Sequence, residues 1–210
     1  MRLHHFAHSS ASYRVRIALA IKGIAVNYVT VDMTKGEQAT EAYAMHNPQR
    51  MVPCLELPDG RVLGQSLAII DYLERLQPEP SVYPADPVAR AEALGIALLI
   101  ACEISPLQAK IVQRRLTGVY SLTDAQVQDW LAHWIRRGLA PVEADLARRW
   151  RGGFAFGPTP SIADICIVPQ LRNAHRFGVD VSDFPTLAAH TAHCLTHPAF
   201  QAAHPDRWAA

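Results

Sequence analysis

The spacing of apolar residues divides the chain into a first part of short alternating elements and a second part that is helical. Residues 2–6 and 26–32 have the composition of short strands. Between them, residues 12–22 place apolar side chains on one helical face, and Gly23 stands in the usual stop position. The pattern therefore predicts a strand–helix–strand unit at the start of the chain.

A second group of elements follows within the first part. It comprises a short helix over 39–45, a hairpin of 52–57 with 61–63, and a helix over 67–76. Asn47-Pro48 ends the first of these helices, and Ser66 is the expected N-cap of the second. The order βαβ followed by αββα predicts a small mixed sheet with helices on its faces.

The stretch 77–87 is rich in proline and is expected to link two domains. Beyond it the helical period dominates. The expected helices cover 88–116 with a kink near Ser105-Pro106, 123–149, a segment opening at Ser161 with Asp164 completing a capping box, and a segment opening at Pro185. We therefore predict domains over 1–80 and 86–210.

The amino-acid composition argues against two classes of function, nucleic-acid binding and a role in the membrane. The 210 residues are half apolar and carry a formal net charge of +1 without a basic run, which argues against nucleic-acid binding. The longest apolar stretch, 93–102, is too short to cross a bilayer, so no membrane role is expected. The cysteines are Cys54, Cys102, Cys166 and Cys194, widely spaced among aliphatic neighbours, and predict buried free thiols in a reducing cytoplasm.

The polar stretch 8–12 at the entrance of the first helix contains Ser9, Ser10 and Ser12. Hydroxyl groups here lie beside unpaired backbone N–H groups and the positive end of the helix dipole. This arrangement favours a bound anion, and a thiolate is one candidate. The alternative is that one serine only caps the helix, which contributes about 1 kcal/mol.

Two further segments point to the same kind of site. In Val52-Pro53 the proline cannot donate to a strand ladder, so backbone groups beside it are left for a ligand. Gln65-Ser66 opens the last helix of the first domain, where an amide, a hydroxyl and helix N–H groups suit a carboxylate. In the predicted sheet all three segments fall toward one end and could surround an extended peptide.

The motifs carrying these residues resemble the zeta class of glutathione transferases, the family of maleylacetoacetate and maleylpyruvate isomerases. The resemblance covers essentially the whole chain, in order. It includes residues 9–19, Asn47-Pro48, Val52-Pro53, 65–70, 83–87, 156–157 with 161–164, 168–170, 173–180 and 200–205. It implies an α/β thioredoxin-like N-terminal domain with a mixed four-stranded sheet, followed by an all-α domain, as a homodimer.

The resemblance also implies residue roles. Ser9 would hydrogen-bond the glutathione thiolate, supported by Ser10 and the N–H of Ala11. Val52 would pair main chain to main chain with the tripeptide, with Pro53 in cis. The γ-glutamyl carboxylate would be held by Gln65 and Ser66, the other end of the cofactor by Gln38 and Arg50, and a substrate carboxylate by Arg176 in the helical domain. For Arg50 a solvated surface charge is the alternative.

The implied activity is a cis–trans isomerisation of a cis-enedioate, with glutathione as a cofactor that is not consumed. Two alternatives remain open. One is a glutathione transferase or reductive dehalogenase that consumes glutathione, and the other is a non-catalytic glutathione-binding protein. His193 and His197 have the i,i+4 spacing of metal ligands but no evident third ligand, so no metal site is predicted.

At several positions that the resemblance places near the substrate, the residue differs from the one usual in the family. His8 stands where arginine is usual, and Ala11 stands where cysteine is usual. In the helical domain, Ser105 replaces glutamine or histidine and Ala109 replaces asparagine, while Gln108 is a candidate to compensate. The residues expected to bind glutathione thus match the family, whereas the residues expected to bind the substrate differ from it.

Overall fold

The computed structural model describes residues 1–208, which form two compact units. Among the described residues, the first unit contains 1–82 together with 197–208, and the second contains Tyr83–Thr196. The sequence analysis placed all of 86–210 in the helical domain, whereas in the structure residues 197–208 group with the first unit. The reason lies in the first helix, whose buried arginine and tyrosine bind this segment.

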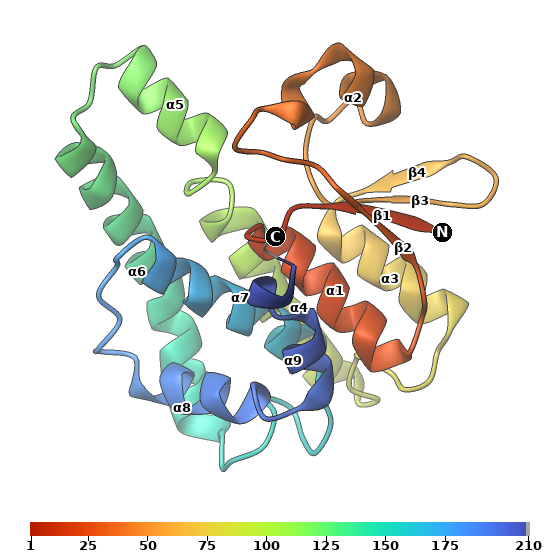
Figure 1. Cartoon of the computed structure of the whole chain (residues 1–210). Helices are drawn as coiled ribbons and strands as arrows, with labels where there is room; N and C mark the ends of the chain where they lie inside the picture. Colours follow the sequence, from red (N-terminus) through yellow and green to blue (C-terminus); the bar gives the residue numbers. More distant parts are fainter. Residues whose placement is uncertain (209–210) are drawn as a thin grey trace. The chain divides into compact units, whose positions relative to one another are not determined.

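The first unit contains a mixed four-stranded sheet with helices on its faces, the thioredoxin-like arrangement expected from the sequence (Figure 1). Its elements are β1 (Arg2–His5), α1 (Ser10–Lys22), β2 (Asn27–Thr30), the 3-10 helix η1 (Glu37–Ala39), α2 (Glu41–His46), β3 (Cys54–Glu56), β4 (Val62–Gly64), α3 (Ser66–Leu76), α9 (Pro198–Ala203) and η3 (Pro205–Arg207). The strand order is β2-β1-β3-β4. β1 is parallel to β2 and antiparallel to β3, and β3 is antiparallel to β4.

Helix α1 is the central element of this unit and packs against both α3 and α9. It ends where expected, because Gly23 adopts the left-handed conformation at φ 64°. Contact on several sides explains why Arg16 is only 1% exposed. Its Nε donates to the carbonyl of Ala203 at 3.0 Å, and Tyr13 donates to the carbonyl of Phe200 at 3.3 Å. These bonds hold α9 in the first unit.

The second unit is built of helices, with an isolated β-bridge between Phe154 and Gly157 in one of its loops. Its elements are α4 (Pro87–Leu98), the π-helix η2 (Leu99–Ile104), α5 (Lys110–Gly118), α6 (Asp124–Arg149), α7 (Ile162–Arg176) and α8 (Pro185–Cys194). The single kinked helix expected over 88–116 is instead interrupted. After the π-turn the chain leaves the helix at Ser105-Pro106, and α5 begins only after Ala109, which has an extended backbone.

Two smaller expectations also needed correction. The N-cap of α3 is Gln65, not Ser66, and Ser66 is the first helical residue. All four cysteines in the described chain are free thiols, but Cys102 is exposed and only the other three are buried. Within the described residues, none of the helices has the length and apolar composition needed to span a membrane.

A buried histidine gives the first unit a pH-dependent stability. His5 is 1% exposed, and its Nδ1 accepts from Arg16 at 3.2 Å, which fixes the neutral tautomer. Burial first, then Arg16 and His4, lowers the pKa of His5 to about 4. The unfolded chain therefore binds the proton more tightly, and stability is lost as pH falls below about 6.5.

We expect the free energy of unfolding to fall by about 2 kcal/mol from this group between pH 7.5 and pH 5. Urea denaturation at both pH values measures the change. The His5→Asn variant keeps an acceptor for Arg16 but cannot titrate, so its stability should depend less on pH. Equal pH dependence in both proteins would show that His5 does not cause it.

Candidate active site

Strand pairing brings the three predicted cofactor segments to one edge of the sheet. His4 of β1 lies opposite Cys54 of β3, and Cys54 lies opposite Gly64 of β4. The chain reaches this edge at the end of β1, the start of β3 and the end of β4. The segments just beyond these points are the entrance of α1, Val52-Pro53 and Gln65-Ser66.

At the entrance of α1, Ser9 is the N-cap and its Oγ accepts from the N–H of Ser12 at 3.2 Å. The capping alternative is therefore realised, and it leaves the hydroxyl proton of Ser9 available to donate. The first turns of α1 and α3, both within the described chain, contain no Asp or Glu. Ser9, Ser10, Ala11 and the neighbouring His8 are all half-buried. These features suit a bound anion.

The second segment carries the cis peptide bond Val52-Pro53, as expected. Val52 precedes β3, so its main-chain groups lie outside the ladder that starts at Cys54. The carbonyl of the preceding residue, Met51, accepts from Tyr43 and from Asn47, each at 2.8 Å. These bonds hold the backbone of the residue before Val52 in place. The sequence showed Asn47 only as a helix-ending residue.

The third segment has an unusual backbone. Gln65 has φ 65° although it is not glycine, a conformation that costs free energy and clusters at functional sites. Its amide donates to Gln49 at 3.0 Å, and the buried hydroxyl of Ser66 accepts from Arg14 at 3.3 Å. Arg14 is 2% exposed, so its charge lies behind the start of α3. The sequence analysis missed Gln49 and Arg14, because their partners are distant in the chain.

The two residues assigned to the far end of the cofactor differ in their surroundings. Gln38 is 8% exposed, and its buried Oε1 has no hydrogen-bond partner among residues 1–208. Such an atom calls for a donor from outside the chain. Arg50 is exposed and donates to the carbonyl of Ala39 and to Glu41, the latter at 2.8 Å. These bonds place the Arg50 side chain next to η1, the element that also carries Gln38.

The helical unit contains the residues assigned to the substrate. Gln108 is buried and exchanges two hydrogen bonds with Gln170, at 2.8 and 3.1 Å. Its amide is therefore paired with Gln170, and a role for Gln108 toward the substrate stays a prediction. The Ser105 hydroxyl donates to the carbonyl of Ile100 at 2.9 Å.

Arg176 is an exposed residue at the end of α7, with its Nε 3.3 Å from the Asn173 oxygen and its guanidinium 4.8 Å from the ring of Phe177. Burial, followed by the nearby Arg172, lowers the pKa of Arg176 from its ordinary value. A positive charge held in this way gains from an anionic ligand. The side chain keeps the fork geometry that suits a carboxylate.

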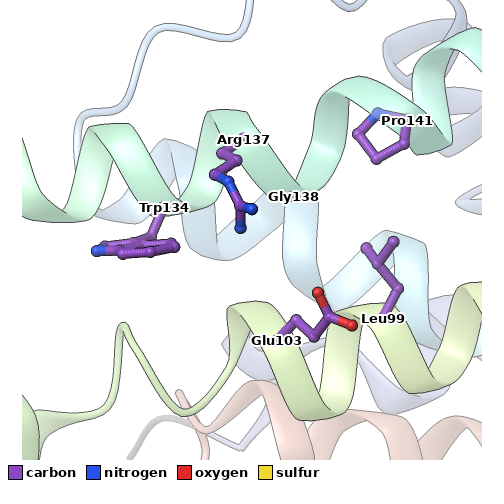
Figure 2. Close-up of a pocket in the computed structure, with 6 residues that line it drawn as sticks. All are labelled: Leu99, Glu103, Trp134, Arg137, Gly138 and Pro141. Carbon is purple, nitrogen blue, oxygen red and sulfur yellow. The ribbon is translucent and has the colours of Figure 1, made fainter.

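A cavity of about 210 Å³ also lies in the helical unit, between η2 and α6 (Figure 2). Its lining is Leu99, Glu103, Trp134, Arg137, Gly138 and Pro141. A Cβ atom on Gly138 would lie 2.3 Å from Ile104, so glycine is needed for the close packing of these two elements. No residue of the predicted site lines this cavity.

Comparison with known proteins gives consistent results over the whole chain. The glutathione S-transferase N-terminal domain matches residues 8–76, and the glutathione S-transferase C-terminal domain matches residues 124–193. The chain is 40% identical to maleylacetoacetate isomerase of Pseudomonas aeruginosa over 98% of this chain and 96% of that protein. It is 37% identical to maleylpyruvate isomerase of a Ralstonia species, covering 98% and 97%.

Solved structures with a similar fold point to the same family. A holo structure of maleylpyruvate isomerase, described as a bacterial zeta-class glutathione transferase, has a TM-score of 0.93 at 36% identity and covers 98% of this chain and 97% of that one. Maleylacetoacetate isomerase of Methylobacterium extorquens, with malonate and glutathione bound, has a TM-score of 0.94 at 35% identity, covering 99% and 97%. The chain therefore belongs to the glutathione S-transferase family, and within it to the zeta class.

Proposed function

We propose that this protein is a glutathione-dependent cis–trans isomerase of maleylacetoacetate or maleylpyruvate. The observation that carries the proposal is the sheet edge at which the N-cap hydroxyl of Ser9, the main chain of Val52 and the start of α3 at Ser66 are brought together. The relatives named above carry these activities in their names. The substrates are cis-enedioates with two carboxylates.

The residues of the first unit fit glutathione. The orphaned Oε1 of Gln38 offers an acceptor, Val52 offers main-chain groups outside the ladder, and the start of α3 offers N–H groups backed by Arg14. When bound, glutathione supplies the sulfur nucleophile that adds to the alkene carbon and later leaves, which permits rotation without net redox change.

The chain's own groups have separate tasks in this reaction. The Ser9 hydroxyl donates a hydrogen bond to the anionic sulfur and so lowers the pKa of that thiol. The Ser10 hydroxyl and the N–H of Ala11 support the same anion. Gln65 and Ser66 hold the γ-glutamyl carboxylate, and Arg50 and Gln38 hold the other end of the cofactor. Arg176 binds a substrate carboxylate, and His8 meets the second carboxylate with a charge that depends on pH.

A cytoplasmic location and a homodimeric state belong to the same proposal. The four free thiols suit a reducing compartment. For the dimer, the support is a set of exposed large apolar side chains on the helical unit, namely Val88, Leu98, Ile111, Val119 and Tyr120.

The test is an ultraviolet assay of cis-enedioates with and without glutathione. We expect turnover of the cis diacid that requires glutathione and leaves its free thiol concentration unchanged. Stoichiometric loss of thiol would instead identify a transferase or a reductive dehalogenase. Tight glutathione binding without any turnover would identify a binding protein.

The same assay tests Arg176. The Arg176→Ala variant should lose about tenfold to a hundredfold in kcat/KM, because a charge-assisted hydrogen bond contributes about 1.5–3 kcal/mol. Arg148→Ala, which removes an arginine that is 80% exposed on α6, serves as the matched control and should keep full activity. Full activity in Arg176→Ala would remove this residue from the substrate site.

A further inference from the structure

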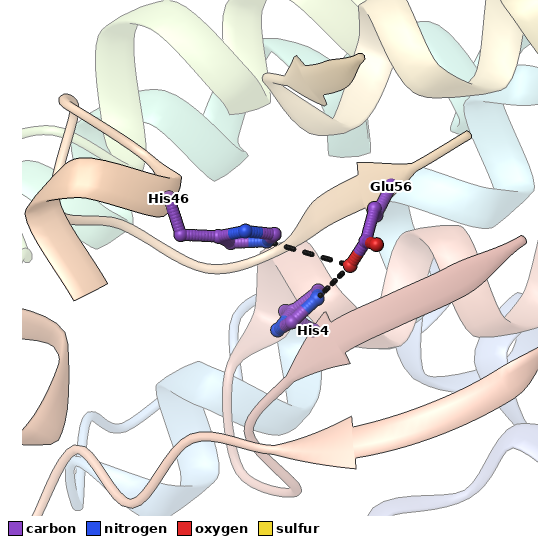
Figure 3. A group of neighbouring side chains, drawn as sticks. All are labelled: His4, His46 and Glu56. Carbon is purple, nitrogen blue, oxygen red and sulfur yellow. Dashed lines mark hydrogen bonds and ion pairs between the residues drawn. The ribbon is translucent and has the colours of Figure 1, made fainter. Parts of the chain in front are cut away.

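Three side chains outside the glutathione edge meet on the sheet face next to α2. His4 comes from β1, Glu56 from β3 and His46 from the end of α2 (Figure 3). His4 Nε2 lies 3.1 Å from Glu56 Oε2, and His46 Nε2 lies 3.9 Å from the same oxygen. One nitrogen from each ring and one carboxylate oxygen all lie within 4.8 Å of one another.

Local structure fixes each of these positions. His4 lies opposite Cys54 in the ladder, and Glu56 is two residues beyond Cys54 along β3. The side chains of His4 and Glu56 therefore point to the same face of the sheet. Arg2, opposite Glu56, lies 3.4 Å from the other carboxylate oxygen, Oε1. Oε2 is therefore the oxygen turned toward both histidines.

The position of His46 is set by the end of α2. Asn47 and Tyr43 both donate to the carbonyl of Met51 and so hold this helix end and the following loop in place. The two imidazole rings contact each other with centroids 4.1 Å apart. The cluster is thus built by elements that are held independently of it.

Hydrogen bonding leaves one atom of the cluster unexplained. His46 Nε2 is shielded from solvent and has no hydrogen-bond partner among residues 1–208. Its 3.9 Å separation from Oε2 is too long for a hydrogen bond. Buried polar atoms are hydrogen-bonded in native proteins, so a nitrogen held 3.9 Å from a carboxylate oxygen, beyond hydrogen-bond distance, indicates an additional group.

We propose that His4, His46 and Glu56 form a Zn²⁺ site, with the two Nε2 atoms and Oε2 as ligands and a water molecule in the fourth position. Two imidazoles and one carboxylate are a donor set that Zn²⁺ takes in proteins, whereas Mg²⁺ and Ca²⁺ prefer oxygen ligands. In a tetrahedral site with bonds of about 2.0 Å, ligand atoms lie about 3.3 Å apart. The measured 3.1 and 3.9 Å bracket this separation.

The site has a structural consequence for the first unit. The ion joins the end of α2 directly to the sheet. That end leads into the loop that carries Arg50 and Val52. A bound ion would therefore order the loop on which the candidate glutathione site depends, without taking part in the chemistry.

The test is a Zn²⁺ titration of the metal-free full-length protein, by calorimetry and by competition with a chromogenic chelator. We expect one saturable site per chain. The Glu56→Gln variant keeps the shape of the side chain, and His46→Ala removes the nitrogen that lacks a partner. Each should weaken binding by more than about a hundredfold, because loss of an outer-shell partner alone costs about 10–100-fold.

The matched control is His133→Ala, which removes an exposed histidine of α6 and should bind Zn²⁺ as the parent does. Circular dichroism of each variant checks the fold, and Glu56→Gln remains decisive if His46→Ala fails to fold. Equal Zn²⁺ affinity in the parent and in Glu56→Gln would overturn the proposal, as would the absence of saturable binding in the parent.

Discussion

Replacing Ser9 with alanine is expected to lower isomerase turnover on the order of 10²- to 10³-fold, the loss typical of removing one donor to a developing anion. A free thiol has a pKa of about 8.5. Without the Ser9 hydroxyl, the pKa of the bound glutathione thiol should rise toward that value, because only the start of α1 then stabilises the anion. The ultraviolet absorbance of the thiolate, titrated in the binary complex, measures this directly.

The substitution also removes the N-cap of α1, since Ser9 Oγ accepts from Ser12. Two controls separate capping from chemistry. Thr123→Ala removes the capping hydroxyl of α6 in the helical unit, costs a similar amount of about 1 kcal/mol, and should leave turnover intact. Ser9→Thr keeps a hydroxyl and should restore most of the activity. Unchanged thiolate absorbance and turnover in Ser9→Ala would contradict the proposed role.

Replacing Asp164 with alanine is expected to lower the free energy of unfolding by about 4 kcal/mol, a large share of the total for a protein of this kind. Asp164 is fully buried. Its Oδ2 accepts from the N–H and the hydroxyl of Ser161 at 2.7 and 2.6 Å, which forms the capping box of α7. Its Oδ1 accepts from the N–H of Ala155 at 2.7 Å and lies 2.6 Å from His190 Nε2.

The loss is large because alanine would leave several buried donors without an acceptor, at about 1–3 kcal/mol each. Urea denaturation of the purified variant measures it. Asp129→Ala removes an exposed aspartate of α6 and should change stability by no more than about 0.5 kcal/mol. If Asp164→Ala were as stable as Asp129→Ala, the buried network would contribute nothing.

The same network explains why the cluster of Asp164, His190 and Cys194 is not a further reactive site. All three residues are buried, so their potential ligand atoms are closed to solvent. The Asp164 carboxylate already makes four hydrogen bonds, two with Ser161 and one each with Ala155 and His190. Burial, followed by Asp164, raises the pKa of the Cys194 thiol far above its ordinary value. The thiol therefore stays protonated.

Local signals predicted the elements whose limits depend on neighbouring residues. Gly23 ends α1 because it adopts a positive φ, and Asn47-Pro48 ends α2. The capping box at Ser161 and the opening of α8 at Pro185 were predicted for the same reason. The order of these elements, with the family motifs, was enough to predict the fold and the class.

What the sequence did not show depends on contacts between distant segments. Arg14 and Arg16 are both buried, because α1 packs against α3 and also against α9. The exchange between Gln108 and Gln170 joins residues 62 positions apart. His4, His46 and Glu56 likewise meet only once the sheet and α2 have formed.

The tight turn that connects β3 to β4 lies at the opposite end of these strands from the candidate glutathione site. Cys54 and Gly64 pair next to the site, whereas Glu56 and Val62 pair next to the turn. Asp59, at the tip, is exposed, and its carboxylate accepts from the N–H and the guanidinium of Arg61. This tip is thus a suitable position for a fluorescent label or an affinity tag, which would report on folding while leaving the ligand contacts intact.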